Sequence, residues 1–194
     1  MSGSTSELTT DVGRPVDLVE AMRRRRMYRE FEDRPVPREL LEQMVWAATR
    51  AQQARSGVRH IVVVDDPALM ATARQVLPGF LNNAPAMLVH CTDTVRAREV
   101  MGRRGVESAT WIDAGAACAH LALMAQTLGL GTCTITSWAQ PAAQALLGLP
   151  DHVRADVTIA VGYVPLTPSP PAKGFRTSWH DNGFGTPFGA GGRG

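Results

Sequence analysis

The chain has 194 residues, of which 44% are hydrophobic and 20% are charged, and its formal net charge is +2. This length and composition predict one globular domain with a substantial core. Twenty basic residues stand against eighteen acidic ones. This near balance disfavours a general nucleic-acid-binding surface, because such binding depends on neutralising many phosphates.

The three cysteines and the first residues indicate where the protein resides. Cys91, Cys118 and Cys133 lie in apolar segments without CxxC or cysteine–histidine spacing. This pattern predicts small, buried, reduced thiols, and it disfavours a disulfide framework or a metal site. The N-terminal MSGSTSELTT is polar and lacks an apolar export signal. We therefore expect a cytoplasmic protein with a disordered segment at 1–15.

The first half of the chain predicts helices that alternate with apolar strands. A short helix is expected in RPVDLVEAMRRR, followed by an extended stretch around Arg29 and Phe31. VPRELLEQMVWAATRAQ predicts a longer helix with Pro37 at its first position and acidic residues near its positive end. HIVVVDD predicts a strand, Asp66 caps a helix that runs to about Leu77, and APAMLVHCT predicts a second strand.

The second half continues the alternation and ends in an irregular region. The segment that starts at Trp111 predicts a long helix ending at Gly129, 132–138 a strand, 141–150 a short helix and 155–164 the last strand. PLTPSPPAKG predicts an irregular crossing, and the domain is expected to span 16–185, with a flexible glycine-rich tail at 186–194. Interleaved helices and strands predict a sheet with helices on both faces.

The long helix that starts at Trp111 is apolar but unlike a membrane span. Asp113, His120 and Gln126 interrupt it, and many of its residues are alanine or glycine. Small residues allow another backbone to approach, which favours the centre of the fold or of a subunit interface, while an ordinary buried helix fits equally well. His120 is interpreted as a core or interface histidine rather than a catalytic base.

Several blocks together resemble the FMN-dependent nitroreductase superfamily, over residues 19–185. They are RRMYREFEDRPVP, NNAPAMLVHC, DAGAACAHLALMAQTLGLG and VGYVPLTPSPPAKGFR. The resemblance implies an α+β fold, specifically a three-layer α/β/α sandwich with a mixed, mostly antiparallel central sheet. It also implies a homodimer that binds two FMN molecules at its interface.

The run of arginines before the helix at Pro37 gains a role from this resemblance. Arg25, Arg26, Met27 and Arg29 fall on family positions that contact the FMN phosphate, ribityl chain and pyrimidine edge. Guanidinium groups match phosphate oxygens bidentately, and a positive charge at the pyrimidine edge stabilises reduced flavin. Taken without the resemblance, the run also fits a solvated basic face or a nucleic-acid patch.

The turn after that helix departs from the family. Relatives commonly have A-P-S-x-x-N-x-Q-P-W, whereas this chain has AQQARSGVRH, without the proline, asparagine and tryptophan. The resemblance implies contacts from Gln52, Gln53, Arg55 and Ser56 to the flavin ring or ribityl chain. The alternative is an ordinary polar connection between a helix and a strand.

The strand after the long helix leads to the family's flavin N5 contact. The resemblance places Thr136 and Ser137 there, where a backbone amide approaches N5. Gly129 and Gly131 are interpreted as helix termination and turn geometry.

The closing segment PPAKGFRTSWHDNGFG supplies the last implied contacts. Arg176, assisted by Lys173, matches a position that reaches the FMN phosphate. Trp179, His180 and Phe184 are expected to pack against the other subunit.

The resemblance implies an FMN-dependent oxidoreductase that takes hydride from NAD(P)H onto flavin N5 and reduces a small acceptor such as a nitroaromatic or a quinone. The protein would position the reactants and tune the flavin, so no catalytic acid or base is assigned. Two alternatives remain open: a flavin-dependent dehydrogenase or oxidase acting on a specialised small molecule, and a binding protein that has lost flavin catalysis. No nucleic-acid or membrane partner is expected.

Overall fold

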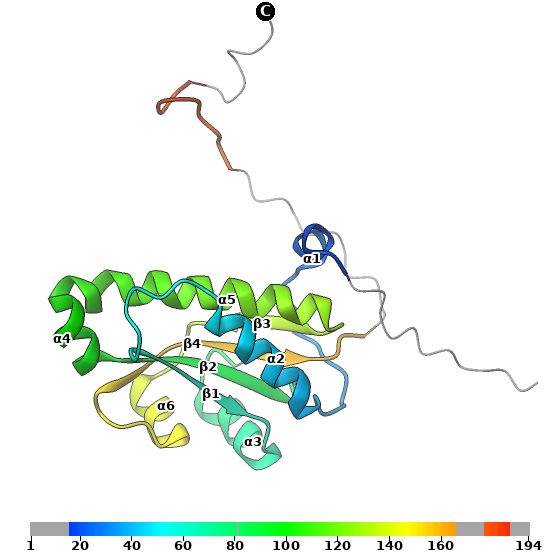
Figure 1. The fold of residues 1–194 in the computed structure, drawn as a ribbon. Helices are drawn as coiled ribbons and strands as arrows, with labels where there is room; N and C mark the ends of the chain where they lie inside the picture. The colour runs from blue at the N-terminus through cyan, green and yellow to red at the C-terminus, as the bar shows by residue number, and fades with distance from the viewer. Residues whose placement is uncertain (1–15, 81, 166–176, 187–194) are drawn as a thin grey trace, which may run out of the picture.

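The computed structural model describes residues 16–80, 82–165 and 177–186. Lys173 and Arg176 therefore lie outside the described residues. Figure 1 shows the elements, which in chain order are α1 (Leu18–Arg24), α2 (Arg38–Thr49), β1 (Arg59–Val64), α3 (Pro67–Val76), β2 (Ala86–Asp93), α4 (Thr94–Arg104), the π-helical turn η1 (Gly105–Ala109), α5 (Thr110–Thr127), β3 (Gly131–Ile135), α6 (Gln140–Leu147) and β4 (Val153–Gly162).

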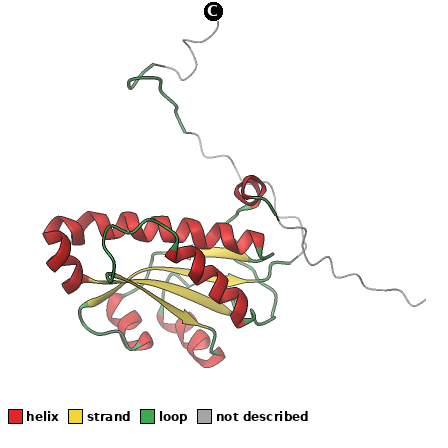
Figure 2. Cartoon of the chain, viewed as in Figure 1, coloured by secondary structure: helices red, strands yellow, loops and turns green. Residues whose placement is uncertain are grey.

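The four strands form one sheet in the order β1-β2-β4-β3. Figure 2 shows this sheet with helices on both sides of it. Every pairing between these strands is antiparallel, and a single parallel bridge joins Met27 to Thr132 of β3. With the helices, this sheet confirms the predicted α+β class. β1 and β3 lie at opposite edges of the sheet, which separates the segments that flank them.

Local sequence signals explain where several helices begin. The carboxylates of Asp17, Asp66 and Asp93 each accept a hydrogen bond of 2.8 Å from a backbone amide in the first turn of the following helix. Pro37 is the N-cap residue of α2 and not its first helical residue, a difference of one position from the prediction.

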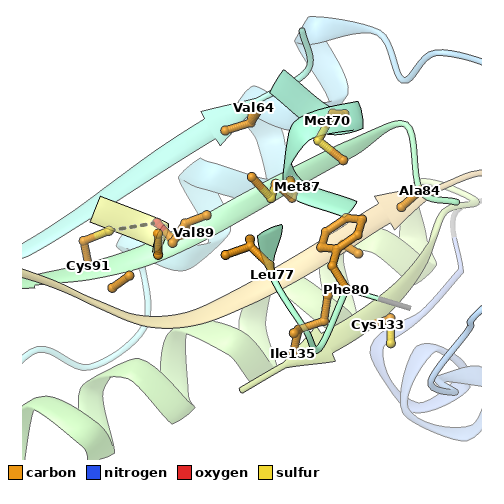
Figure 3. Packing of buried hydrophobic residues seen from close by; sticks show 14 of the residues in the cluster. Val64, Met70, Leu77, Phe80, Ala84, Met87, Val89, Cys91, Cys133 and Ile135 are labelled. Atoms are coloured by element: carbon orange, nitrogen blue, oxygen red, sulfur yellow. Dashed lines mark hydrogen bonds between the residues drawn. The ribbon is translucent and has the colours of Figure 1, made fainter. Parts of the chain in front are cut away.

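Two apolar clusters pack on the two faces of the sheet. α2 and α5 cover one face, where Leu41, Met44 and Leu121 are completely buried. α3 and α6 cover the other face, and Figure 3 shows Phe80 and Met70 directed at the sheet there. The two central strands, β2 and β4, are buried along almost their whole length, whereas the edge strand β1 is mostly half-buried.

The helix α4 and the turn η1 were not predicted from the sequence. Asp93 caps α4, which has only Ala97 buried, so its sequence lacks the apolar stripe that marks a packed helix. Gly102 has a φ of 67°, which kinks the segment before it continues through η1 into α5. α4 and η1 therefore form a bent helical segment that leads into the N-terminal end of α5 (Figure 1).

The long helix α5 is buried on one side only. Ala114, Ala117 and Ala125 face the sheet, whereas Trp111 and Ile112 are 47% and 60% exposed. The buried side fits an ordinary core helix, and the exposed side leaves the placement at a subunit interface a prediction. None of the described helices is long and apolar enough to cross a membrane.

The side chain of His120 links the two helices on the same face of the sheet. Its Nδ1 lies 3.1 Å from the carbonyl oxygen of Ala47 in α2. His120 is nevertheless exposed in the single chain, so it is not a core histidine, and its placement at a subunit interface stays a prediction.

Two glycines near the end of α5 have different physical roles. Gly129 has a φ of 71°, the left-handed conformation that ends a helix, as predicted. Gly131 instead begins β3, where a Cβ atom would overlap the side chain of Val164 and lie 2.8 Å from the ring of Tyr28. Close packing, and not turn geometry, therefore requires glycine at 131.

Replacing Gly131 by alanine is expected to lower the free energy of unfolding by about 1–3 kcal/mol, because the added methyl group overpacks the contact with Val164 and Tyr28. Gly115→Ala is the matched control, since a Cβ there meets no atom within 4 Å and alanine favours the helix. Urea unfolding of both variants measures the difference, and equal stabilities would contradict the packing role of Gly131.

A buried polar cluster connects β2 and β4 beneath α5. The carboxylate of Asp156 is at the centre of the cluster. Its Oδ2 accepts hydrogen bonds from Thr92 Oγ1 at 2.5 Å and from His90 Nδ1 at 2.9 Å. Its Oδ1 accepts a third, from Arg154 Nε at 2.6 Å. The side chains of Asp156 and His90 are almost completely buried. The strand pairing shifts here between His90 and Cys91, so the carboxylate stands at a β-bulge. The guanidinium of Arg154 also lies over the ring of Trp111 at 4.2 Å.

The cysteines are free thiols, as predicted, and two are strongly perturbed. Burial, aided by the nearby Asp156 carboxylate, raises the pKa of Cys91 and of Cys118 to about 12. Burial also raises the pKa of Cys133, and the nearby Arg29 partly opposes this change.

These shifted thiols predict a loss of stability in alkaline solution. In the unfolded chain a thiol ionises near pH 8.5, so from there to about pH 12 the unfolded state holds fewer protons than the folded state. Stability should therefore fall as pH rises through this window, by up to about 1.4 kcal/mol per pH unit for each thiol. Cys91→Ala is expected to flatten the slope above pH 9 and to leave the slope below pH 8 unchanged. An unaltered alkaline slope would contradict the shift assigned to Cys91.

Candidate functional site

A cleft of about 300 Å³ lies beside the outer strand β3. Three segments that are distant in sequence form it: residues 27–29, the residues Pro78, Gly79 and Asn82 after α3, and the end of β3 with the residues that follow. Its lining residues are Met27, Arg29, Pro78, Gly79, Asn82, Cys133, Thr134, Ile135, Thr136 and Ser137.

The first wall of the cleft is an extended segment attached to the sheet. The amide of Tyr28 donates to the carbonyl of Thr132 at 2.9 Å, and the amide of Glu32 donates to the carbonyl of Tyr163 at 2.8 Å. Phe31, between them, is buried in the core. These attachments place Met27 and Arg29 on the cleft while Tyr28 packs against Gly131.

The second wall contacts the residues after β3 closely. A Cβ atom at Gly79 would overlap the carbonyl oxygen of Ser137 and lie 2.8 Å from Ile135. Phe80 is buried beside it, and the side chain of Asn82 accepts a hydrogen bond of 3.0 Å from the amide of Ala84. Glycine at 79 therefore allows the loop to approach the backbone of Ser137.

The charge in the cleft comes from Arg29. Among the described residues that line the cleft, it alone has a charged side chain, and that side chain is exposed. The remaining lining side chains are apolar, hydroxyl, amide or thiol groups. A cleft with this lining suits a largely uncharged, planar ligand that carries an anionic or electron-rich group on the side of Arg29.

The other arginines of the run lie at the end of α1. Arg25 is the exposed C-cap residue, and Arg26 Nη1 donates to the carbonyls of Arg23 at 2.7 Å and Arg25 at 3.0 Å. Arg24 pairs with Glu20 at 2.6 Å. Arg25 and Arg26 are thus close in sequence to the cleft but do not line it.

The turn with the predicted contacts Gln52, Gln53, Arg55 and Ser56 lies elsewhere in the molecule. It precedes β1, at the sheet edge opposite to β3, and all four side chains are exposed. Two groups hold its backbone: Asp113 Oδ2 accepts a hydrogen bond from the amide of Ala54 at 2.8 Å, and Arg59 donates to the carbonyl of Gln52. Within one chain, the described cleft therefore contains none of these four residues.

The structure brings together Met27, Arg29, Thr136 and Ser137, which were predicted from separate parts of the sequence. The second wall was not predicted, although Pro78 and Gly79 between a helix and a strand are a signal for a shaped loop. Cys133 also lies in the cleft and was interpreted only as a buried thiol.

A comparison with protein families gives one decisive match. The sequence model of the Nitroreductase family matches residues 53–163, which is more than half of the chain. The chain belongs to the nitroreductase family. This finding confirms the resemblance on which the site prediction was based.

Relatives within the nitroreductase family cover most of this chain. An NADH dehydrogenase from Thermus thermophilus is 26% identical and aligns with 76% of this chain and 87% of its own length. An FMN-dependent nitroreductase from Clostridium difficile is 27% identical, with a TM-score of 0.63 over 75% of this chain and 87% of that one. The fold is also shared with an NADPH:FMN oxidoreductase from Vibrio harveyi, at 21% identity and a TM-score of 0.73, over 86% of this chain and 77% of that one. These relatives support an oxidoreductase as the general class.

Proposed function

We propose that this protein binds FMN in the cleft beside β3 and acts as an NAD(P)H-dependent oxidoreductase on a small acceptor. The supporting observation is that Met27, Arg29, Thr136 and Ser137, the family positions for the flavin, meet in one cleft. When bound, FMN supplies the hydride chemistry, accepting hydride at N5 from NAD(P)H and delivering it to an acceptor such as a nitroaromatic or a quinone.

The residues of the cleft fit parts of the cofactor. Arg29 offers a guanidinium fork to the phosphate or to the pyrimidine edge, with Arg25 and Arg26 nearby in sequence, and we expect Lys173 and Arg176 to assist. The backbone at Thr136 and Ser137 faces the cleft without a bulky side chain, which leaves room for a flat ring. The protein orients the cofactor and excludes water from its covered face.

The size of the cleft favours a site completed by a second subunit. A volume of about 300 Å³ is at the lower limit for ligand pockets, so one chain covers only part of a cofactor. The helical face of α2 and α5 exposes three large apolar side chains, Trp46, Trp111 and Ile112, and Asp113 of α5 holds the turn 52–56 beside this face. We propose that this surface pairs in a homodimer and that the turn of one subunit reaches the cleft of the other. Helices on both faces of the sheet correspond to the three-layer arrangement of such a subunit.

Anaerobic titration of the FMN-loaded protein tests the activity. NADH or NADPH is expected to bleach the flavin absorption, and a nitroaromatic or quinone added afterwards is expected to restore it. Flavin that neither nicotinamide bleaches would contradict the proposal, and bleaching by another small molecule would then favour the dehydrogenase or oxidase alternative.

Sedimentation analysis at micromolar concentration tests the dimer, and a monomer would contradict a shared site.

A further inference from the structure

The side chain of Asn83 pairs in both directions with the backbone of Phe31, 52 residues away. Its Oδ1 accepts a hydrogen bond of 2.9 Å from the amide of Phe31, and its Nδ2 donates one of 2.7 Å to the carbonyl of the same residue. A primary amide that satisfies both groups of one residue imitates a pairing strand. It holds that residue against translation and rotation.

Asn83 is itself held from a third direction. Arg74, in the last turn of α3, donates from Nη2 to the carbonyl of Asn83 at 3.4 Å and to that of the next residue, Ala84, at 2.8 Å. Asn83 also precedes the buried residues Ala84 and Ala86, where β2 begins. The side-chain amide of Asn83 is therefore attached to a well-held backbone, and its two hydrogen bonds fix the position of Phe31 relative to that backbone.

This pairing connects the two walls of the cleft. Asn82, the neighbour of Asn83, belongs to the second wall, and Arg29, two residues before Phe31, belongs to the first. Arg29 lies between two attachment points, the bond of Tyr28 to β3 and the bonds of Phe31 to Asn83. If the bonds to Asn83 are lost, Tyr28 and Glu32 still hold the two ends of the segment, and the freedom gained lies between them, at residues 29–31.

We propose that Asn83 is a positioning residue that fixes Arg29 in the cleft and thereby sets the affinity for an anionic flavin. The identity of the ligand rests on the proposed function, whereas the positioning of residues 27–31 does not. The side chain of Asn83 hydrogen-bonds to the backbone of Phe31 and is not among the residues that line the cleft, so we expect its effect on binding to pass through that backbone.

Two variants separate the two hydrogen bonds. Asn83→Ala removes both, whereas Asn83→Asp keeps the acceptor for the Phe31 amide but places an oxygen against the Phe31 carbonyl. Gln75→Ala is the control, because it removes an amide from an exposed position of α3 close in sequence. Both Asn83 variants are expected to bind FMN about 10-fold more weakly, and the control is expected to bind like the wild type.

A double-mutant cycle with Arg29→Ala distinguishes positioning from general stabilisation. If Asn83 acts through Arg29, then Arg29→Ala should weaken FMN binding much less in the Asn83→Ala background than in the wild type. Riboflavin, which lacks the phosphate, should be affected less than FMN by Asn83→Ala if Arg29 meets the phosphate. Additive losses in the cycle would overturn the proposal.

Hydrogen exchange without flavin tests the positioning on its own. Amides in 27–32 should exchange faster in Asn83→Ala, while those of α2 and α5 stay as in the wild type. Unchanged exchange in 27–32 would overturn the positioning role. If exchange rises in this segment but the wild type binds no FMN, Asn83 keeps its role and the cofactor assignment falls.

Discussion

Replacing Arg29 by alanine is expected to weaken FMN binding by about 10- to 100-fold, the range for losing a hydrogen bond to a charged group. Arg29 supplies the charge among the described lining residues of the cleft, so its loss removes the group that meets the phosphate or the pyrimidine edge. Its side chain is exposed, so the free energy of unfolding should change little.

Fluorescence titration of FMN with the purified variant measures this effect. Arg98→Ala is the matched control, because Arg98 is an exposed arginine on α4 and its removal changes the net charge equally. A wild-type dissociation constant in Arg29→Ala would exclude Arg29 from the site. An equal loss in Arg98→Ala would indicate a long-range charge effect instead of a contact.

Replacing Asp156 by alanine is expected to lower the free energy of unfolding by about 3–5 kcal/mol, because it leaves a buried cluster without its anion. The carboxylate of Asp156 accepts from three side chains, and Arg154 would lose its compensating charge. Arg154 also donates to Thr110 at 3.0 Å, so the N-terminal end of α5 should loosen as well.

Urea unfolding of Asp156→Ala and of Asp65→Ala gives the comparison. Asp65 pairs with Arg38 at 2.9 Å on the surface, where both side chains are more than a third exposed, so its loss should cost less than about 1 kcal/mol. Similar losses in the two variants would show that the buried cluster stabilises no more than a surface ion pair. Asp156→Asn keeps one acceptor oxygen and is expected to fall between wild type and alanine.

Most helices and strands could be predicted because their signals are local. Each of these signals lies in one short window of sequence: the apolar stripe and acidic first turn of α2, the cap at Asp66 and the largely apolar run of β2. The sequence of α4 lacks such a signal, because Ala97 is its single buried residue. Its polar residues are as typical of a loop as of a helix. The exposure of one side of α5 could not be predicted from its sequence either, because exposure depends on which other elements pack against the helix.

The candidate site could be predicted only in part. The resemblance located Arg29, Thr136 and Ser137, but the wall at Pro78 and Gly79 is created by a tertiary contact with Ser137, which no local pattern reports. The strand order decides that Gln52 to Ser56 stand at the opposite edge from β3. Strand order depends on long-range pairing, which no local pattern reports, and because the resemblance places the flavin between two subunits, the contacts of these four residues stay a prediction.

The visible absorption spectrum of the purified protein, with chromatographic identification of any released chromophore, tests the proposed flavin site most directly. We predict the absorption bands of a flavin and the release of FMN, or their appearance when FMN is added to protein that was purified without it. A protein that stays colourless after excess FMN is added and removed would contradict the flavin site, and would mean that this nitroreductase-family fold serves a function without the cofactor.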